Sequence, residues 1–196
     1  MAGIRFRETM AGPFALGETD PRRGAEKAKA AGTQLAMHAE ISIHDLEAFR
    51  ADPQHAGGLT GHVDYPPLGM ALPASYGVFK LFAPSGEPEL AWMVYELGFE
   101  HQGRRYYLAG KKEVRNGSIF RMWGETTTLY TLLHEGADAR GAVAGAGVLS
   151  LGVGALLRLL STLHATDAAS SPERLRTVGG FGGFFSRQLW RTYVAR

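Results

Sequence analysis

The sequence predicts a mainly β protein, in which an antiparallel meander of about seven strands closes as a β-barrel or folds over as a sandwich. Three observations support this class. Short segments alternate between apolar and polar residues, turn sequences separate these segments, and helical periodicity occurs only near the end of the chain. This order of elements disfavours parallel α/β folds, in which strands and helices alternate.

The clearest strand covers residues 34–44. Every odd position from Leu35 to Ile43 is apolar, while His38, Glu40 and His44 lie on the opposite face. Asp45 is a natural N-cap for a short helix that Asp52-Pro53 ends. Further strands are expected at 58–65, 76–83, 90–101, 104–115, 119–134 and 140–149. Because Gln102-Gly103 and Asn116-Gly117 are typical hairpin turns, the strands that they join should be consecutive antiparallel neighbours.

The chain is expected to divide into three parts. Residues 1–33 lack a sustained apolar period and are expected to be an extended N-terminal lead-in. Residues 34–150 should form the antiparallel β domain, and residues 151–196 a C-terminal helical segment packed on it, with helices at 154–165 and 181–194. A length of 196 residues with 45% hydrophobic side chains is sufficient for one core.

Composition excludes several classes of function. The chain has no cysteine, which excludes disulfide scaffolds, thiolate zinc sites, iron–sulfur clusters and cysteine nucleophiles. The arginine-rich C-terminal part lacks a dense basic cluster, so nucleic acid is not an expected partner. Residues 1–10 contain no apolar run, so a cytoplasmic location is expected. The uncharged segment 141–157 is interpreted as a buried strand followed by a helix and not as a transmembrane span.

The glycine-rich and serine motifs do not indicate a cofactor or a hydrolase. Gly145-Ala146-Gly147 is followed by Ser150 where a dinucleotide fingerprint has its third glycine. Ser75 and Ser150 both lack the first glycine of a nucleophile elbow. No cofactor is therefore expected.

Lys112 is the most informative residue, because it falls on the apolar face of its strand. A lysine that points inward needs a partner or a lowered pKa, and Glu8 and Glu125 are the candidate partners. The cation is interpreted either as orienting the polar end of a ligand or as part of a structural ion pair. Packing in the core accounts for most of the aromatic residues on the strands, but a barrel can also enclose a ligand. The candidate ligand-binding residues are Lys112, Tyr95, Tyr106, Trp123 and Tyr130.

The histidines provide an alternative site. His38 and Glu40 share one strand face, and His62 shares the next with Asp64, so pairing of the strands would bring imidazoles and a carboxylate together. Because polar strand faces usually meet water, no metal is expected. The alternative is a metal site formed by His38, Glu40 and His62. The catalytic candidates are Lys112, Glu8 and His62.

The order of several motifs resembles a known bacterial accessory domain. The motifs are Phe6-Arg7-Glu8-Thr9-Met10 with Gly12, Asp52-Pro53 with His55 and Gly61, Gly77 with Phe79, Met93 with Tyr95, Gly110 with Lys112, and Trp123 with Thr126 to Tyr130. Glu125 departs from this pattern, because an aspartate is expected before the threonine run. The domain is associated with cholesterol-oxidase-like, FAD-dependent oxidoreductases of the glucose-methanol-choline type and with α/β-hydrolases. The resemblance implies an accessory role near the chemistry of sterols and other lipids.

The expected function is non-catalytic binding of an apolar small molecule or lipid, sterol-like, as an accessory to an oxidoreductase or hydrolase partner. Two alternatives stay open. One is a cofactor-independent isomerase, cyclase or lyase that acts on an apolar substrate in the barrel. The other is a protein-interaction module, which would have an exposed apolar patch in place of a cavity.

Overall fold

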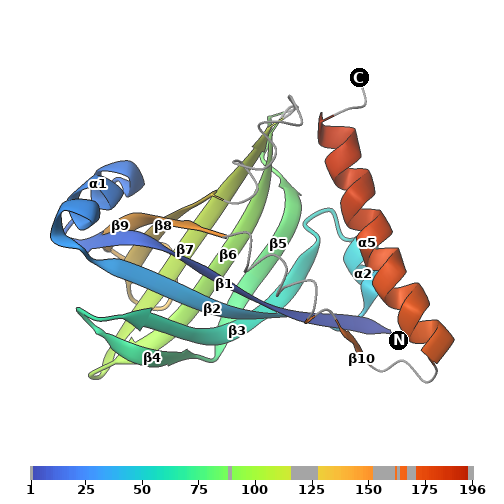
Figure 1. Ribbon diagram of the computed structural model, residues 1–196, viewed down its shortest axis with the longest axis horizontal. Coiled ribbons are helices and arrows are strands. Elements are labelled where there is room, and N and C mark those ends of the chain that lie inside the picture. The colour runs from blue at the N-terminus through green and yellow to red at the C-terminus, as the bar shows by residue number, and fades with distance from the viewer. Residues whose placement is uncertain are drawn as a thin grey trace.

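The computed structural model describes residues 2–87, 90–115, 128–151, 162, 164–166 and 171–193 (Figure 1). Its elements in chain order are β1 (Gly3–Leu16), α1 (Pro21–Ala31), β2 (Gln34–Ile43), α2 (Leu46–Ala51), β3 (Ala56–Tyr65), β4 (Gly69–Ala74), β5 (Tyr76–Pro84), β6 (Leu90–His101), β7 (Arg104–Arg115), β8 (Thr128–Glu135), β9 (Val143–Ser150), β10 (His164–Thr166) and α5 (Ser171–Tyr193).

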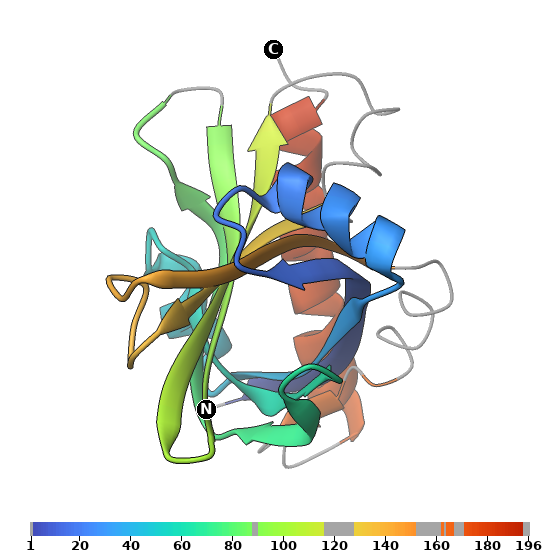
Figure 2. The ribbon, with the colours of Figure 1, turned by 90° about the vertical axis from the view of Figure 1, so that its left-hand side faces the viewer.

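The strands form a closed antiparallel barrel, which confirms the predicted fold class and decides between barrel and sandwich. Eight strands follow one another in the order β1, β2, β3, β5, β6, β7, β8 and β9, and β9 pairs again with β1. Figure 2 looks into this ring of strands. β4 extends the sheet from β3, and β10 extends it from β1.

The predicted hairpin order is also confirmed. β6 pairs with β7 from Leu90 opposite Arg115 to His101 opposite Arg104, with Gln102-Gly103 between the two strands. β7 then pairs with β8, also antiparallel. Asn116-Gly117 and the first part of the predicted strand 119–134 lie outside the described residues.

Residues 1–33 are not an extended lead-in, which corrects the prediction for this segment. β1 pairs with β2 from Ile4 opposite Ile43 to Pro13 opposite Gln34, so it is a full member of the barrel. Its even positions alternate into the core, but the buried Glu8 interrupts that apolar face and conceals the period in the sequence. The segment after it forms α1, which Asp20 caps at the N-terminus.

The C-terminal predictions hold only in part. His164–Thr166, at the end of the predicted helix 154–165, form β10 opposite Gly3–Arg5, and the rest of that prediction lies outside the described residues except for Thr162. The last helix, α5, begins at Ser171 and not at 181. It lies beside the end of the barrel that carries α2 and β10 (Figure 1). None of the helices described is long and apolar enough to cross a membrane.

Buried apolar side chains point into the barrel interior. Inward positions alternate along each strand, as at Met93, Tyr95, Leu97 and Phe99 of β6, all of which are buried. At the α5 end, the Phe181 ring packs against those of Phe6 and Phe49. The apolar interior therefore continues from the strands to the covering helix.

Candidate functional site

Lys112 lies inside the barrel, as its place on the apolar face of the strand predicts. Its side chain is 1% exposed, and across the sheet it stands opposite Met93 of β6. Leu108 and Val114 point to the same side of β7 and are also buried. A lysine in such surroundings loses its hydration, and only nearby charge or dipoles can compensate.

Glu8 supplies the compensating charge from β1. Its side chain is 4% exposed, and its carboxylate acts electrostatically on Lys112. Closure of the barrel is what brings these residues together, because β1 and β7 do not pair directly. Glu8 Oε1 is buried and has no hydrogen-bond partner among the described residues. A buried carboxylate oxygen in this condition is costly unless a donor reaches it.

Tyr95 of β6 completes the cluster. The Lys112 Nζ atom lies 4.6 Å from the centre of the Tyr95 ring, within the range of a cation–π contact. Burial raises the pKa of the Tyr95 hydroxyl well above its usual value, and the neighbouring Glu8 carboxylate adds to the rise. Burial also lowers the pKa of Lys112, and Glu8 opposes that change. Glu8, Lys112 and Tyr95, the interior cluster, thus form a coupled polar group in an apolar barrel.

The side chains around the interior cluster are either apolar or already hydrogen-bonded. The Thr131 hydroxyl is buried but donates to the carbonyl of Leu129 on its own strand. Phe79 packs edge-on against the Tyr95 ring, with centroids 5.2 Å apart. The interior cluster is therefore a small polar group surrounded by apolar side chains.

The structure brings together some of the predicted ligand-binding residues. Lys112 and Tyr95 are in contact, and Tyr106 lies on the same inward face, stacked on Phe99 at 5.6 Å. Tyr130 is separate from them, because its hydroxyl accepts from Arg22 of α1 outside the barrel. Trp123 and the other predicted partner of Lys112, Glu125, lie outside the described residues.

The alternative metal set of His38, Glu40 and His62 is only partly assembled. His38 stands directly opposite His62, as pairing of the two strands predicts. Glu40 is instead engaged by Arg7, whose Nε atom lies 2.6 Å from Glu40 Oε2. Asp64 takes its place, with Oδ2 3.1 Å from His38 Nε2. His62 alternates with the buried Val63 and so lies on the outer face of the barrel. It is therefore separate from Lys112 and Glu8, the other two catalytic candidates, which are buried in the interior.

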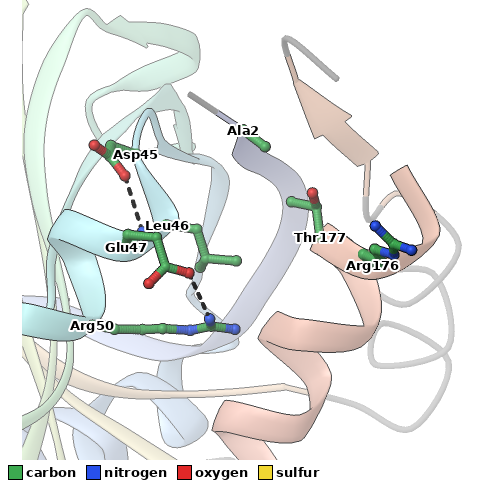
Figure 3. A pocket seen from close by; sticks show the side chains of 7 residues that line it. All are labelled: Ala2, Asp45, Leu46, Glu47, Arg50, Arg176 and Thr177. Carbon is green, nitrogen blue, oxygen red and sulfur yellow. Dashed lines mark hydrogen bonds and ion pairs between the residues drawn. The ribbon is translucent and has the colours of Figure 1, made fainter. Parts of the chain in front are cut away.

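A pocket of about 280 Å³ lies between α2, the start of β1 and α5 (Figure 3). Asp45 caps α2 there as predicted, and Arg50 forms an ion pair with Glu47 at 3.0 Å. The pocket is lined by Ala2, Asp45, Leu46, Glu47, Arg50, Arg176 and Thr177. These residues come from segments far apart in the chain, so no local sequence pattern predicts the pocket. The Glu47 side chain that pairs with Arg50 is 85% exposed, so this pocket is more open to water than the interior cluster.

The fold and this cluster define an antiparallel eight-stranded β-barrel with a buried carboxylate, ammonium and phenol. In comparisons with known proteins, no family model matches the chain, and searches of curated proteins and of solved structures found no match.

Proposed function

We propose that the barrel binds an apolar small molecule or lipid whose single polar group lies at the interior cluster. The observation that carries this proposal is the buried Glu8 Oε1 atom, which has no hydrogen-bond partner among the residues described. A ligand that donates a hydrogen bond to this oxygen would remove the cost of leaving it unpaired.

The chemistry of the cluster favours an alcohol. An ionised carboxylate only accepts hydrogen bonds, whereas an ammonium group only donates them. A hydroxyl group both donates and accepts, so it matches Glu8 and Lys112 at once. The buried apolar side chains of the interior would contact the remainder of a sterol-like molecule. An accessory role for an FAD-dependent oxidoreductase or an α/β-hydrolase in the cytoplasm is part of this proposal and rests on the sequence pattern.

Titration of the protein with a fluorescent sterol, dehydroergosterol, tests the proposal. We expect saturable binding at one site per chain, weakened at least tenfold by Glu8→Gln, because the loss of a charge-assisted hydrogen bond costs about 1.5–3 kcal/mol. Glu40→Gln, a change on the outer face, is the matched control and should bind like the original protein. Absence of saturable binding, or equal effects of the two variants, would overturn the proposal.

The same cluster supports a second candidate, a cofactor-independent isomerase. Glu8 would take a proton from the carbon next to a carbonyl group and return it to another carbon, while Lys112 and Tyr95 donate hydrogen bonds to the enolate oxygen. The unpartnered oxygen of Glu8 is the observation that favours this chemistry. Incubation with a β,γ-unsaturated ketosteroid tests it, with formation of the conjugated α,β-unsaturated ketone followed by its ultraviolet absorption. Isomerisation that Glu8→Gln abolishes would establish turnover, and no isomerisation would leave binding as the function.

A further inference from the structure

We propose that His38, His62 and Asp64 bind a divalent transition-metal ion, of the zinc class, on the outer face of the barrel. One potential ligand atom from each residue lies within 4.8 Å of the others. Two imidazoles and one carboxylate are ligands that Zn²⁺, Co²⁺ and Ni²⁺ accept, and a water molecule can complete a tetrahedral site. This site is independent of the interior cluster.

The sheet register fixes the backbone positions of the three ligands. His38 of β2 pairs with His62 of β3, and Asp64 follows two positions later on the same face. Met37 and Val63, which pair with each other next to the site, are fully buried, so the register cannot slip without exposing them. The three side chains are consequently held on one outer patch of the barrel.

Gly61 permits the close approach of β2 and β3 at this point. Its φ angle is 148°, and a Cβ atom there would lie only 1.9 Å from the His38 carbonyl oxygen. Only glycine fits this position without a shift of the backbone. The residue next to the site is therefore adapted to the strand spacing that places His38 beside His62.

Neighbouring groups orient two of the ligands. Thr9 Oγ1 lies 3.0 Å from His38 Nδ1, and His38 Nε2 lies 3.1 Å from Asp64 Oδ2. With Nδ1 donating to Thr9 in the metal-bound state, Nε2 would carry no proton and its lone pair would bind the ion. The Asp64 Oδ1 atom accepts a hydrogen bond of 2.6 Å from the backbone N–H of Ala71. Such supporting hydrogen bonds are typical of metal-ligating histidines and carboxylates, because they fix the tautomer and the orientation.

His62 is the ligand that must move. Its ring stacks on that of His38, with centroids 4.3 Å apart and planes 14° from parallel. In-plane lone pairs of parallel stacked rings cannot meet at one ion, so rotation of the His62 ring accompanies binding. The ion would replace the direct contact of 3.1 Å between His38 Nε2 and Asp64 Oδ2. Glu40 on the same face is not available, because it pairs with Arg5 and Arg7.

Titration of the untagged full chain with Co²⁺ and Zn²⁺ tests the site. We expect one ion per chain, a Co²⁺ absorption spectrum of tetrahedral type, and displacement of Co²⁺ by Zn²⁺. His62→Ala and Asp64→Asn should each weaken binding by more than tenfold, and Thr9→Val by about tenfold, the lower end of the effect of losing a supporting hydrogen bond. His44→Ala, an exposed histidine just beyond β2, is the matched control.

Two results would overturn the proposal. One is the absence of saturable binding of either ion to the unmodified chain. The other is a loss of binding in His44→Ala as large as that in His62→Ala, which would indicate general association with surface histidines. Circular dichroism of each variant would verify that the barrel is intact, since all the substituted side chains lie on its outer face.

Discussion

The Lys112 ammonium group lies 4.6 Å from the centre of the Tyr95 ring, and both side chains are at least 97% buried in the barrel. The aromatic face and the Glu8 carboxylate together replace part of the hydration that Lys112 loses. Removal of one charge from such a group leaves the other without compensation. The stabilities of Glu8 and Lys112 variants should therefore be strongly interdependent.

Lys112→Met should lower the free energy of unfolding by about 3–5 kcal/mol, because the Glu8 carboxylate is then buried without its cation. Addition of Glu8→Gln should recover a large part of this loss. Urea unfolding of the two single variants and the double variant measures the coupling between the residues. Strictly additive effects would show that Glu8 and Lys112 do not interact.

The interior cluster was partly predictable because strand alternation is a local signal. Lys112 occurs at an inward position of an unmistakable strand, and Glu8 was one of two candidate partners. Tyr95 was expected at the site, but its contact with Lys112 depends on the register of β6 and β7. Register and barrel closure involve residues far apart in the chain, which a local pattern does not specify.

The errors in the sequence predictions have local causes. The alternation of β1 was present, from Ile4 through Phe6 and Met10 to Phe14, but Glu8 interrupted its apolar side. The signals for α1 were also present, with Asp20 as the N-cap, a proline after it and Gly32 at its end. The prediction that Tyr130 lies at the ligand site was wrong, because its side chain points to the outer face of β8, where α1 packs.

Gly24→Ala should destabilise the protein by about 1–3 kcal/mol, despite the better helix propensity of alanine. A Cβ atom at this position of α1 would lie 2.1 Å from the carbonyl oxygen of Ala146 in β9, and neither backbone can give way easily. Gly182→Ala in α5 meets nothing within 4 Å and should instead stabilise its helix by up to about 1 kcal/mol. Thermal unfolding of both variants measures the contrast. A neutral Gly24→Ala would mean that α1 does not pack so closely on β9.

Phe181→Ala should weaken the attachment of α5 by about 3–5 kcal/mol. The side chain is 7% exposed, and its ring lies 5.9 Å from that of Phe6 and 6.5 Å from that of Phe49. Leu175→Ala on the same helix is the control, because Leu175 is 76% exposed. Limited proteolysis should cut α5 faster in Phe181→Ala only. Equal cleavage of the two variants would contradict the packing of α5 through Phe181.

Asp64→Asn should reduce the dependence of stability on pH in acid. The backbone N–H of Ala71, and after it His38, lower the pKa of Asp64 below its usual value of 3.8. A carboxylate with a lowered pKa in the folded state contributes stability above the pKa of the unfolded state and loses it as the pH falls through the folded pKa. The stability difference between the original protein and Asp64→Asn should therefore be largest near neutral pH and shrink below about pH 3.8. Urea unfolding at a series of pH values measures this difference, with Glu26→Gln on the exposed side of α1 as the control. A stability difference that does not change with pH would contradict the role of the ionised Asp64 carboxylate.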